Sequence, residues 1–322
     1  MNLAFAGFRH SHILGLYDMA VNSDKVNITG CFEENSEARE KAKADKGIVF
    51  NYESYEELLS DEKVDAVAIG DYYGIRGKMV IEALKSGKHV ICDKPICTSL
   101  SELEEIERLT KEKNLKLACM FDLRYIPQIA KVKEIVKEGG IGELINISFT
   151  GQHFLDYGNR PGWYFEEGKH GGTVNDIAIH GIDLIKFITG KNLSNINCVK
   201  TWNAFADKEP DFKDCAQFMV EMEGISVMAD VSYAAPKCNK FLPTYWDFYF
   251  WGKDGMINFK YCESSVHLYR SGCEEIIECK APEKTYIDEF IEEINGEGIG
   301  TDTVETLKSQ RQVLEIQKKA DE

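Results

Sequence analysis

Short apolar runs separated by predicted helices organise the first 120 residues. The runs are continuous rather than alternating, which is typical of a parallel sheet covered by helices on both faces. We therefore predict a doubly wound, mostly parallel α/β Rossmann domain over residues 1–120, with ligands at the carboxyl ends of its strands. The predicted strands lie at about 3–7, 26–32, 48–50, 64–69, 89–92 and 115–120. The predicted helices end near 21 and span 36–46, 54–59, 75–86 and 99–113.

The pattern changes after residue 120, and strands separated by glycine-containing turns become frequent. Such strands predict a large, mainly antiparallel sheet within a second, α+β domain over residues 121–322. A sheet that packs helices on one face leaves the other face open, and an apolar open face implies a partner. We expect a homo-dimer or homo-tetramer formed through this sheet. The predicted strands are 144–151, 195–203, 214–222, 225–233, 246–251, 256–261 and 265–270, and the predicted helices are 127–137, the stretch ending at 190, 286–294 and 303–320.

Length and charge narrow the class of protein. A chain of 322 residues suits two domains, and its 38 basic and 54 acidic residues give a net charge of −16 that repels nucleic acid and anionic membranes. The longest apolar runs, such as 66–69, are strand-length, so no membrane-spanning helix is expected. Residues 1–6 indicate a first strand rather than a signal peptide.

Cysteine usage bears on compartment and metals. The ten cysteines are scattered, several of them inside apolar strands, and no C-x-x-C pair is present. Buried thiols of this kind are typical of a reduced cytoplasm, and the spacing predicts no metal site.

The turn after the first strand is a candidate phosphate site. Gly7 ends the strand and a helix follows, so backbone N–H groups and the helix dipole point at the turn. The glycine fingerprint of dinucleotide-binding proteins is incomplete, however, because Arg9 and His12 occupy its second and third positions. Alone, this turn is weak support for a nucleotide.

Three further strand ends carry polar residues. Glu33 follows the second strand 21 residues after His12, close to the spacing at which an acid binds the ribose of NAD and repels NADP. The turn at 70–72 can lie under a nucleotide, and Lys94 would face the nicotinamide. The alternatives are a solvated turn at Glu33 and a solvated loop lysine, and NADP remains open as the cofactor.

Residues 171–183 combine an apolar helix face with titratable groups. Thr173 and Asp176 have the spacing of a helix cap, while Asp176, His180 and Asp183 share one helix face. A histidine beside a carboxylate on a buried helix is a candidate for proton transfer. The alternative is a satisfied core histidine with capping aspartates. The preceding loop, 152–170, is rich in the aromatic and polar groups that hold hydroxyl-rich ligands, or is an ordinary surface loop.

Three segments resemble one known family. Residues 87–95 (GKHVICDKP) are similar to its A-G-K-H-V-x-x-E-K-P segment, 121–127 to its F-x-x-R-F-x-P segment, and 171–183 to its G-G-G-x-x-x-D-x-x-x-H-x-x-D helix. The family is that of glucose-fructose oxidoreductase, inositol dehydrogenase and the rhizopine-catabolism protein MocA. The resemblance covers nearly the whole chain and implies NAD(P)-dependent oxidoreduction. It departs at the first turn and at 71–76, where the family's T-P-x-x-x-H is absent.

The resemblance implies roles for specific residues. His180 would take the hydroxyl proton of a sugar or polyol, Asp176 would orient His180 or the substrate, and Lys94 would bind the reacting oxygen. Asp183 is expected to be a structural or orienting partner. The candidate cofactor-binding residues are Gly7, Phe8, Arg9, His10, Ser11, His12, Glu33, Gly70, Asp71, Tyr72, Asp93 and Lys94. The candidate substrate-binding residues are Lys94, Arg124, His153, Tyr157, Trp163, Asp176 and His180.

Two other functions stay open at this point. An enzyme that retains NAD could oxidise a sugar transiently and cleave a bond beside the new carbonyl. A non-catalytic NAD-binding sensor would explain the incomplete glycine fingerprint.

Overall fold

The computed structural model describes residues 1–238, 240–297 and 302–322, which divide into two compact units. Unit 1 contains residues 1–120, 161–171 and 284–311, and unit 2 contains residues 121–160, 172–283 and 312–322. The first division falls at residue 120, where the sequence pattern changes. The segments 161–171 and 284–311 group with unit 1 although they follow that division in sequence.

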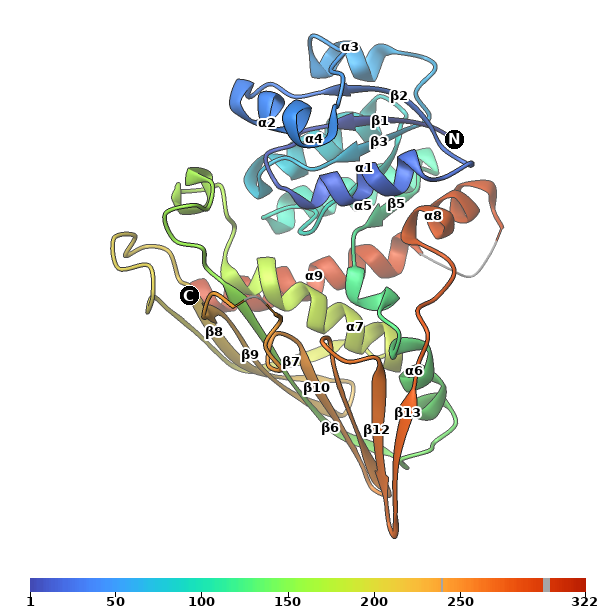
Figure 1. Ribbon diagram of the computed structural model, residues 1–322, viewed down its shortest axis with the longest axis vertical. Helices are drawn as coiled ribbons and strands as arrows, with labels where there is room; N and C mark the ends of the chain where they lie inside the picture. Colours follow the sequence, from blue (N-terminus) through green and yellow to red (C-terminus); the bar gives the residue numbers. More distant parts are fainter. Residues whose placement is uncertain (239, 298–301) are drawn as a thin grey trace. The chain divides into compact units, whose positions relative to one another are not determined.

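Unit 1 contains a five-stranded parallel sheet in the order β2-β1-β3-β4-β5 (Figure 1). The predicted doubly wound α/β fold is thereby confirmed. The strands are β1 (Asn2–Ala6), β2 (Asn27–Phe32), β3 (Ala66–Ile69), β4 (His89–Cys92) and β5 (Leu117–Cys119). The helices between and after them are α1 (His12–Val21), α2 (Ser36–Lys46), α3 (Tyr55–Ser60), α4 (Tyr73–Lys85) and α5 (Leu100–Lys113). Helix α8 (Tyr286–Asn295) also belongs to this unit.

The strand predicted at 48–50 is wrong, since these residues form no strand. Ile48 is buried in the core whereas Val49 is 73% exposed, so this apolar run does not line a sheet. Helix α2 ends just before it at Gly47, whose φ of +66° is the left-handed conformation that commonly terminates helices.

Backbone hydrogen bonds continue the sheet one residue past several strands. Gly70 N–H donates to the Ala6 carbonyl at 3.0 Å, and Asp93 N–H donates to the Ile69 carbonyl at 2.9 Å. Because the strands are parallel, these bonds hold the following turns side by side at one edge of the sheet. Backbone hydrogen bonds thus hold Gly70 and Asp93 in register with the neighbouring strands.

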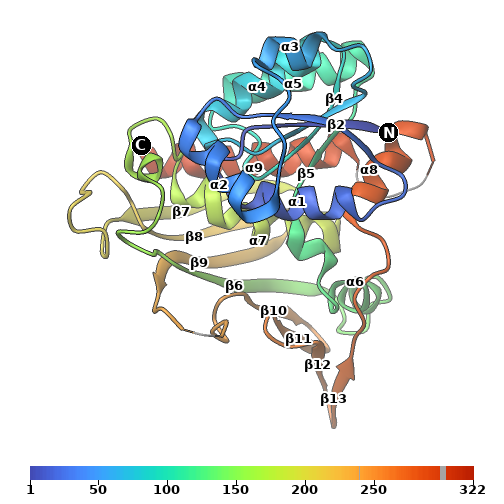
Figure 2. The ribbon, with the colours of Figure 1, turned by 45° about the horizontal axis from the view of Figure 1, so that its top comes forward.

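Unit 2 is built on an eight-stranded sheet in the order β13-β12-β11-β10-β6-β9-β8-β7. Only β6 and β9 pair in parallel, so the predicted mainly antiparallel sheet is confirmed. Figure 2 shows helix α7 (Ile179–Thr189) along one face of this sheet. The strands are β6 (Leu144–Phe154), β7 (Leu193–Trp202), β8 (Cys215–Met222), β9 (Ile225–Ala235), β10 (Asp247–Gly252), β11 (Gly255–Lys260), β12 (Ser265–Arg270) and β13 (Cys273–Glu278).

Strand β13 lies at the edge of the sheet and was not predicted. Its sequence, CEEIIE, lacks a clear apolar alternation, and Ile276 is 60% exposed. An edge strand with little burial carries too weak a pattern to detect from sequence. Helix α6 (Ile129–Lys137) completes unit 2 together with the end of α9 (Thr303–Asp321). Among the helices of the described ranges, none is long and apolar enough to cross a membrane.

The two faces of the unit 2 sheet differ. Phe218, Val220 and Ala229 are buried, whereas the alternate residues Met219 and Met228 are 40% and 60% exposed. The exposed side is hollowed, with a volume of 630 Å³ over strands β6 to β10. We call it the outer face of the sheet.

The stretch 171–190 begins differently from its prediction. Residues 174–178 form a π-helix that leads into α7, and the predicted cap at Thr173 is wrong. Thr173 already has helical dihedrals, and its hydroxyl donates to the Lys213 carbonyl instead. The side-chain oxygen of Gln317 accepts the N–H groups of Val174 (3.1 Å) and Asn175 (3.2 Å). A residue of the last helix therefore supplies the cap.

We expect Gln317→Ala to destabilise the protein by roughly 2–4 kcal/mol, because two buried N–H groups would lose their acceptor. Urea unfolding followed by circular dichroism measures this loss. Lys318→Ala, at the exposed neighbouring position of the same helix, is the matched control and should stay within about 0.5 kcal/mol of wild type. Equal stability of Gln317→Ala and the control would contradict the capping role.

Candidate active site

Three carboxylates lie at the carboxyl ends of neighbouring strands in unit 1. Glu33 follows β2, Asp71 follows β3 and Asp93 follows β4. The side chains of Glu33 and Asp93 are fully buried, and Asp71 is 6% exposed. Buried carboxylates require partners, so the contacts of each one define what this edge of the sheet can do.

The Glu33 carboxylate is hydrogen-bonded to backbone N–H groups. It accepts the Phe8 N–H and, at 2.6 Å, the Asn35 N–H, and Arg9 Nε lies 3.7 Å away. Burial, with the nearby charge of Asp71, raises the pKa of Glu33 to about 7. The residue predicted to bind the ribose is therefore buried and already hydrogen-bonded, and ribose binding stays a prediction.

Arg9 lies between the first turn and the turn after β3. Its Nε is 3.4 Å from the Asp71 carboxylate, and its guanidinium lies 5.0 Å from the centre of the Tyr72 ring. Burial raises the pKa of Asp71, while Arg9 opposes that rise. Gly7 has a φ of +78°, and a Cβ there would lie 2.6 Å from the Asp71 Cβ. The fold thus requires glycine at position 7 to pack two turns together.

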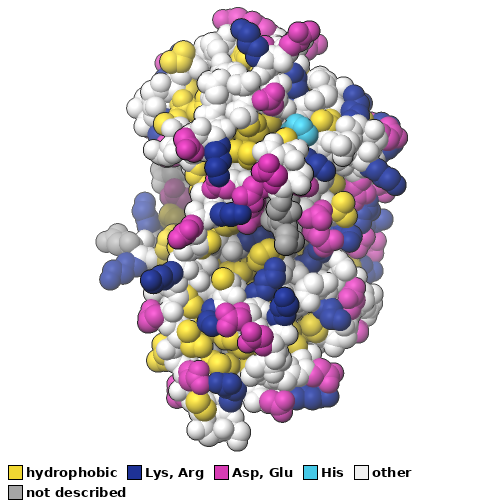
Figure 3. Space-filling model, turned by 90° about the vertical axis from the view of Figure 1, so that its right-hand side faces the viewer, with side chains coloured by type: hydrophobic (Ala, Val, Ile, Leu, Met, Phe, Trp, Pro, Cys, Tyr) yellow, Lys and Arg dark blue, Asp and Glu magenta, His cyan; other side chains and the backbone are white. Residues whose placement is uncertain are grey.

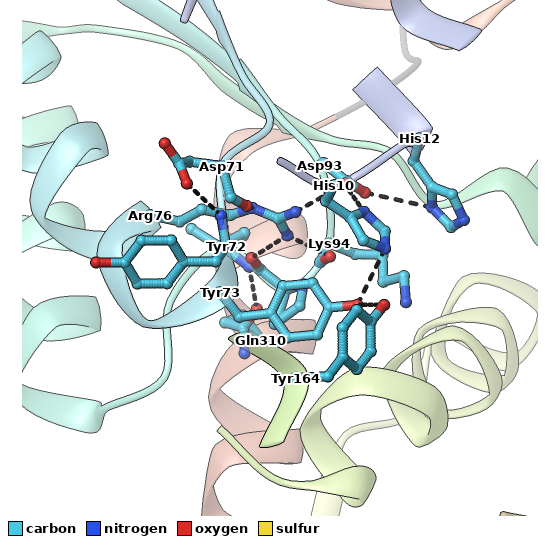
Figure 4. Close-up of polar contacts among 12 residues, drawn as sticks. His10, His12, Asp71, Tyr72, Tyr73, Arg76, Asp93, Lys94, Tyr164 and Gln310 are labelled. Atoms are coloured by element: carbon cyan, nitrogen blue, oxygen red, sulfur yellow. Dashed lines mark hydrogen bonds and ion pairs between the residues drawn. The ribbon is translucent and has the colours of Figure 1, made fainter. Parts of the chain in front are cut away.

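Arg76 is the fully buried cation of this edge (Figure 4). It donates to the Asp93 carboxylate at 2.7 Å and to the carbonyls of Asp71 (2.7 Å), Lys94 and Pro95 (3.1 Å). Burial opposes ionisation of Asp93, but Arg76 and then His10 outweigh it and hold the pKa of Asp93 well below its usual range. In the sequence, Arg76 lies within the stretch 71–76 that departs from the family motif, and no role was predicted for it.

A hydrogen-bonded chain runs from Asp93 through His10 to two tyrosines (Figure 4). His10 Nδ1 bonds the Asp93 carboxylate, His10 Nε2 lies 3.1 Å from the Tyr73 hydroxyl, and that hydroxyl lies 2.9 Å from the Tyr164 hydroxyl. Burial lowers the pKa of His10 to about 3 although Asp93 opposes the shift. His10 is therefore a neutral imidazole at ordinary pH and connects the acid to the phenols.

Trp163 and Tyr164 belong to unit 1 although they follow its first 120 residues in sequence. Their rings stack at 4.1 Å, and Trp163 packs edge-on against Tyr73 at 5.0 Å. The Gly74 N–H donates to the Lys169 carbonyl at 2.8 Å, which ties the segment 161–171 to the start of α4. Trp163, predicted to bind substrate, thus packs beside the chain from Asp93 to Tyr164, a placement that sequence spacing could not indicate.

Lys94 follows β4 and is 3% exposed. Its ammonium lies 5.7 Å from the centre of the Tyr73 ring, and its carbonyl is bonded by Arg76. Helix α1 begins at His12, whose Nδ1 lies 3.5 Å from the carboxylate of Asp93, the residue before Lys94. The Ser11 side chain makes no capping bond to the first turn of this helix. An uncapped helix start at the edge of a Rossmann sheet suits a phosphate, so these residues fit a dinucleotide.

Unit 2 places the predicted proton-transfer residues on its buried helical stretch. Asp176 is 3% exposed and accepts the Tyr233 hydroxyl, which projects from β9. His180 is 6% exposed and packs edge-on against Trp246 at 5.7 Å. The tyrosine was not predicted, and it fixes the carboxylate in one orientation.

The remaining predicted substrate residues of unit 2 have different surroundings. Arg124 forms two bonds to Asp183, at 2.7 and 2.5 Å, and both side chains are buried. Asp183 thus orients Arg124. His153 lies 4.8 Å from the Tyr245 ring, and Tyr157 is 38% exposed. Roles of these residues in substrate binding stay predictions.

Comparison with known proteins identifies similar chains. Residues 7–121 match the family model described as oxidoreductase family, NAD-binding Rossmann fold, and residues 129–258 match the GFO/IDH/MocA C-terminal domain. A levoglucosan dehydrogenase of Pseudarthrobacter phenanthrenivorans is 29% identical over 176 residues, which cover 53% of this chain and 44% of the relative. The chain thus aligns with less than half of that relative's length.

Solved structures share the fold over nearly the whole chain. A protein of Erwinia carotovora atroseptica, whose oxidoreductase assignment is provisional, superposes with a TM-score of 0.90 at 23% identity and covers 99% of this chain and 98% of its own. A levoglucosan dehydrogenase in complex with NADH and levoglucosan gives a TM-score of 0.82 at 19% identity, covering 100% and 97%. At such identities the likeness establishes the fold.

We expect Glu33→Gln to change how stability depends on pH. The pKa of Glu33 in the folded protein, about 7, lies above the ordinary 4.5, so the native state favours the protonated form. Wild type should therefore lose stability as pH rises from about 4.5 through about 7, by up to roughly 3 kcal/mol, and the variant should lack this loss. Urea unfolding at a series of pH values measures it.

The matched control for this prediction is Glu34→Gln at the exposed neighbouring position. It should follow the wild-type pH dependence. If the stability of wild type and of Glu33→Gln changed in parallel between about pH 4.5 and about pH 7, the pKa of Glu33 would not be raised by folding, and the prediction would be wrong.

Proposed function

The chain belongs to the GFO/IDH/MocA oxidoreductase family, and on that premise we propose that it is an NAD-dependent dehydrogenase acting on a hydroxyl carbon of a sugar or polyol. Membership confirms the family predicted from the three sequence motifs and, at the level of the family, an oxidoreductase with a nicotinamide cofactor. The observation that carries the proposal is the buried Lys94 at the carboxyl end of β4. Ligands of open α/β sheets bind at that edge.

The cofactor is proposed to bind along the same edge of unit 1. The uncapped start of α1 would receive the pyrophosphate, and the turn 70–72 would lie under the nucleotide. Glu33 and Asp71 put acidic groups at the ends of β2 and β3, which disfavours the 2′-phosphate of NADP. Glu33 would have to release its backbone partners before it could accept a ribose hydroxyl. We therefore propose NAD, with Arg9 as the cation nearest to both acids.

Three residues are proposed to share the chemistry. His180 would take the proton of the substrate hydroxyl, and a bound nicotinamide would supply the hydride acceptor needed to oxidise that alcohol to a carbonyl. The ammonium of Lys94 donates a hydrogen bond to the reacting oxygen and stabilises its developing negative charge. Asp176, fixed by Tyr233, orients the imidazole or a substrate hydroxyl. General base catalysis contributes on the order of 10²–10⁴-fold in rate.

A carbohydrate is the proposed substrate class. One relative is a levoglucosan dehydrogenase. This chain offers His153, which lies against the rings of Tyr233 and Tyr245, and the partly exposed Tyr157. Ring faces and planar hydrogen-bonding groups suit sugars and polyols.

A second copy of the chain is proposed to cover the outer face of the unit 2 sheet. Met219 and Met228, which line the hollow of 630 Å³, are 40% and 60% exposed, and Trp251 of β10 is 44% exposed. An apolar open sheet face is unusual for a monomer. On the face of the molecule seen in Figure 3, acidic side chains lie among basic ones, and with a net charge of −16 this disfavours nucleic acid or membrane as the partner.

We also propose a cytoplasmic location. The ten cysteines all lie within the described residues and form no disulfide, and five of them are buried. Thiols of this number without disulfides are typical of reducing compartments.

Replacement of His180 by Ala should lower turnover by about 100-fold or more while NAD binding is kept, because a general base is lost but unit 1 is unchanged. Thermal-shift screening of NAD, NADH, NADP and NADPH selects the nucleotide, and nicotinamide absorbance with a panel of polyols and sugars measures turnover. His267→Ala, which removes a partly exposed histidine of strand β12, is the matched control. A loss of less than about tenfold in His180→Ala would exclude the proposed base.

Substitution of Met228 by Glu should dissociate the proposed oligomer, because a charge buried in an apolar contact is costly. Light scattering after size-exclusion chromatography gives the mass. Val49→Glu, at a position 73% exposed in unit 1, is the control and should leave the mass unchanged. A wild-type protein that runs as a monomer at micromolar concentration would overturn the proposed assembly.

A further inference from the structure

A metal-ligand cluster is formed by two histidines of the first turn and the acid after β4. One ring nitrogen of His10, one of His12 and a carboxylate oxygen of Asp93 all lie within 4.8 Å of one another. We propose that His10, His12 and Asp93 bind a divalent transition metal, with Zn²⁺ the best match to two imidazoles and one carboxylate. The sequence predicted no metal site, because His-x-His and a carboxylate 81 residues further on form no recognisable spacing.

The carboxylate of Asp93 has one oxygen in need of a partner. Oδ2 is bonded by Arg76 and His10, whereas Oδ1 is buried and has no hydrogen-bond partner within the described ranges. His12 Nδ1 lies 3.5 Å from Oδ1, about the separation of two ligand atoms that share one tetrahedral metal. Leaving a buried carboxylate oxygen unpaired is costly, so a cation at this position would stabilise the fold.

The surroundings orient the ligands as in known metal sites. Ligating histidines usually bond a second group through the other ring nitrogen, and here the Tyr73 hydroxyl lies 3.1 Å from His10 Nε2. A hydroxyl can donate or accept, so Tyr73 permits the tautomer in which His10 Nε2–H donates to it and Nδ1 is unprotonated. Metal binding at Nδ1 would then replace the hydrogen bond that this nitrogen makes to the Asp93 carboxylate. Arg76 holds the carboxylate through Oδ2 and leaves Oδ1 directed at His12.

The ligand set selects the metal class. Two nitrogen ligands and one oxygen suit Zn²⁺ and its neighbours such as Co²⁺, whereas Mg²⁺ and Ca²⁺ prefer all-oxygen sites. Three protein ligands leave a coordination position for water or a ligand oxygen, and the His12 side chain is 42% exposed and gives access from solvent. The positive charge of Arg76 opposes the cation, so we expect weaker binding than in a closed four-ligand site.

The proposed metal site explains why histidines occupy the first turn, where the glycine fingerprint of dinucleotide-binding proteins is incomplete. His12 stands at the third position of the incomplete glycine fingerprint, and His10 lies within the same turn. A metal bound there would supply positive charge at the start of α1, where an uninterrupted glycine turn would offer only backbone N–H groups. Binding of the metal itself does not depend on the proposed dehydrogenase activity.

The test uses the full chain without a histidine tag, stripped with a chelator and dialysed against Co²⁺ or Zn²⁺ without nucleotide. We expect stoichiometric metal by elemental analysis and a visible Co²⁺ absorption band of a nitrogen-ligated site. His12→Ala should weaken binding by about 100-fold or more, since even outer contacts to a metal contribute 10–100-fold. His10→Gln, with its own Co²⁺ titration, tests the buried ligand.

The matched control is His267→Ala, which removes a partly exposed histidine that lies 3.4 Å from the Glu263 carboxylate. It should bind Co²⁺ as wild type does. Equal binding by wild type and His12→Ala would overturn the proposal and leave His12 as an ion-pair partner of Asp93. Stoichiometric binding in a protein without dehydrogenase activity would support the metal site and count only against the proposed function.

Discussion

The buried pair of Arg76 and Asp93 is the interaction on which the ligand edge of unit 1 depends. Arg76 reaches from helix α4 to the acid after β4, and its other nitrogens hold the carbonyls of Asp71, Lys94 and Pro95. Removing one partner of a buried pair leaves an uncompensated charge, at a cost of about 3–5 kcal/mol. The pair therefore fixes two turns and the backbone of Lys94 at once.

The same acid also orders groups that could take part in chemistry. Asp93 fixes His10, His10 contacts Tyr73, and Tyr73 contacts Tyr164, so one buried carboxylate positions an imidazole and two phenols. Two charged groups that neutralise each other are needed before so many polar atoms can be buried at a sheet edge. Both the proposed metal site and the position of Lys94 follow from this arrangement.

In unit 2, the neutral side chains of Gln317 and Tyr233 satisfy the buried polar groups around the proposed general base. The π-helical start of the stretch carrying Asp176 and His180 needs acceptors for its first N–H groups, and Gln317 provides one oxygen for two of them. Tyr233 then fixes Asp176 by donating its hydroxyl. Gln317 of α9 and Tyr233 of β9 are far apart in sequence, and together they hold the stretch that carries Asp176 and His180.

The sequence by itself determined the parallel sheet, the antiparallel sheet and the family. It also placed Lys94 after a strand of the first sheet, and Asp176 and His180 on one helical stretch. These follow from local periodicity and short motifs, which a single stretch of chain carries. Only the tertiary structure decided that Glu33 is buried, that Tyr164 bonds Tyr73, and that Gln317 caps a segment 143 residues away. Such contacts join residues distant in the chain, and no local pattern records them, because burial and hydrogen bonding are settled by packing.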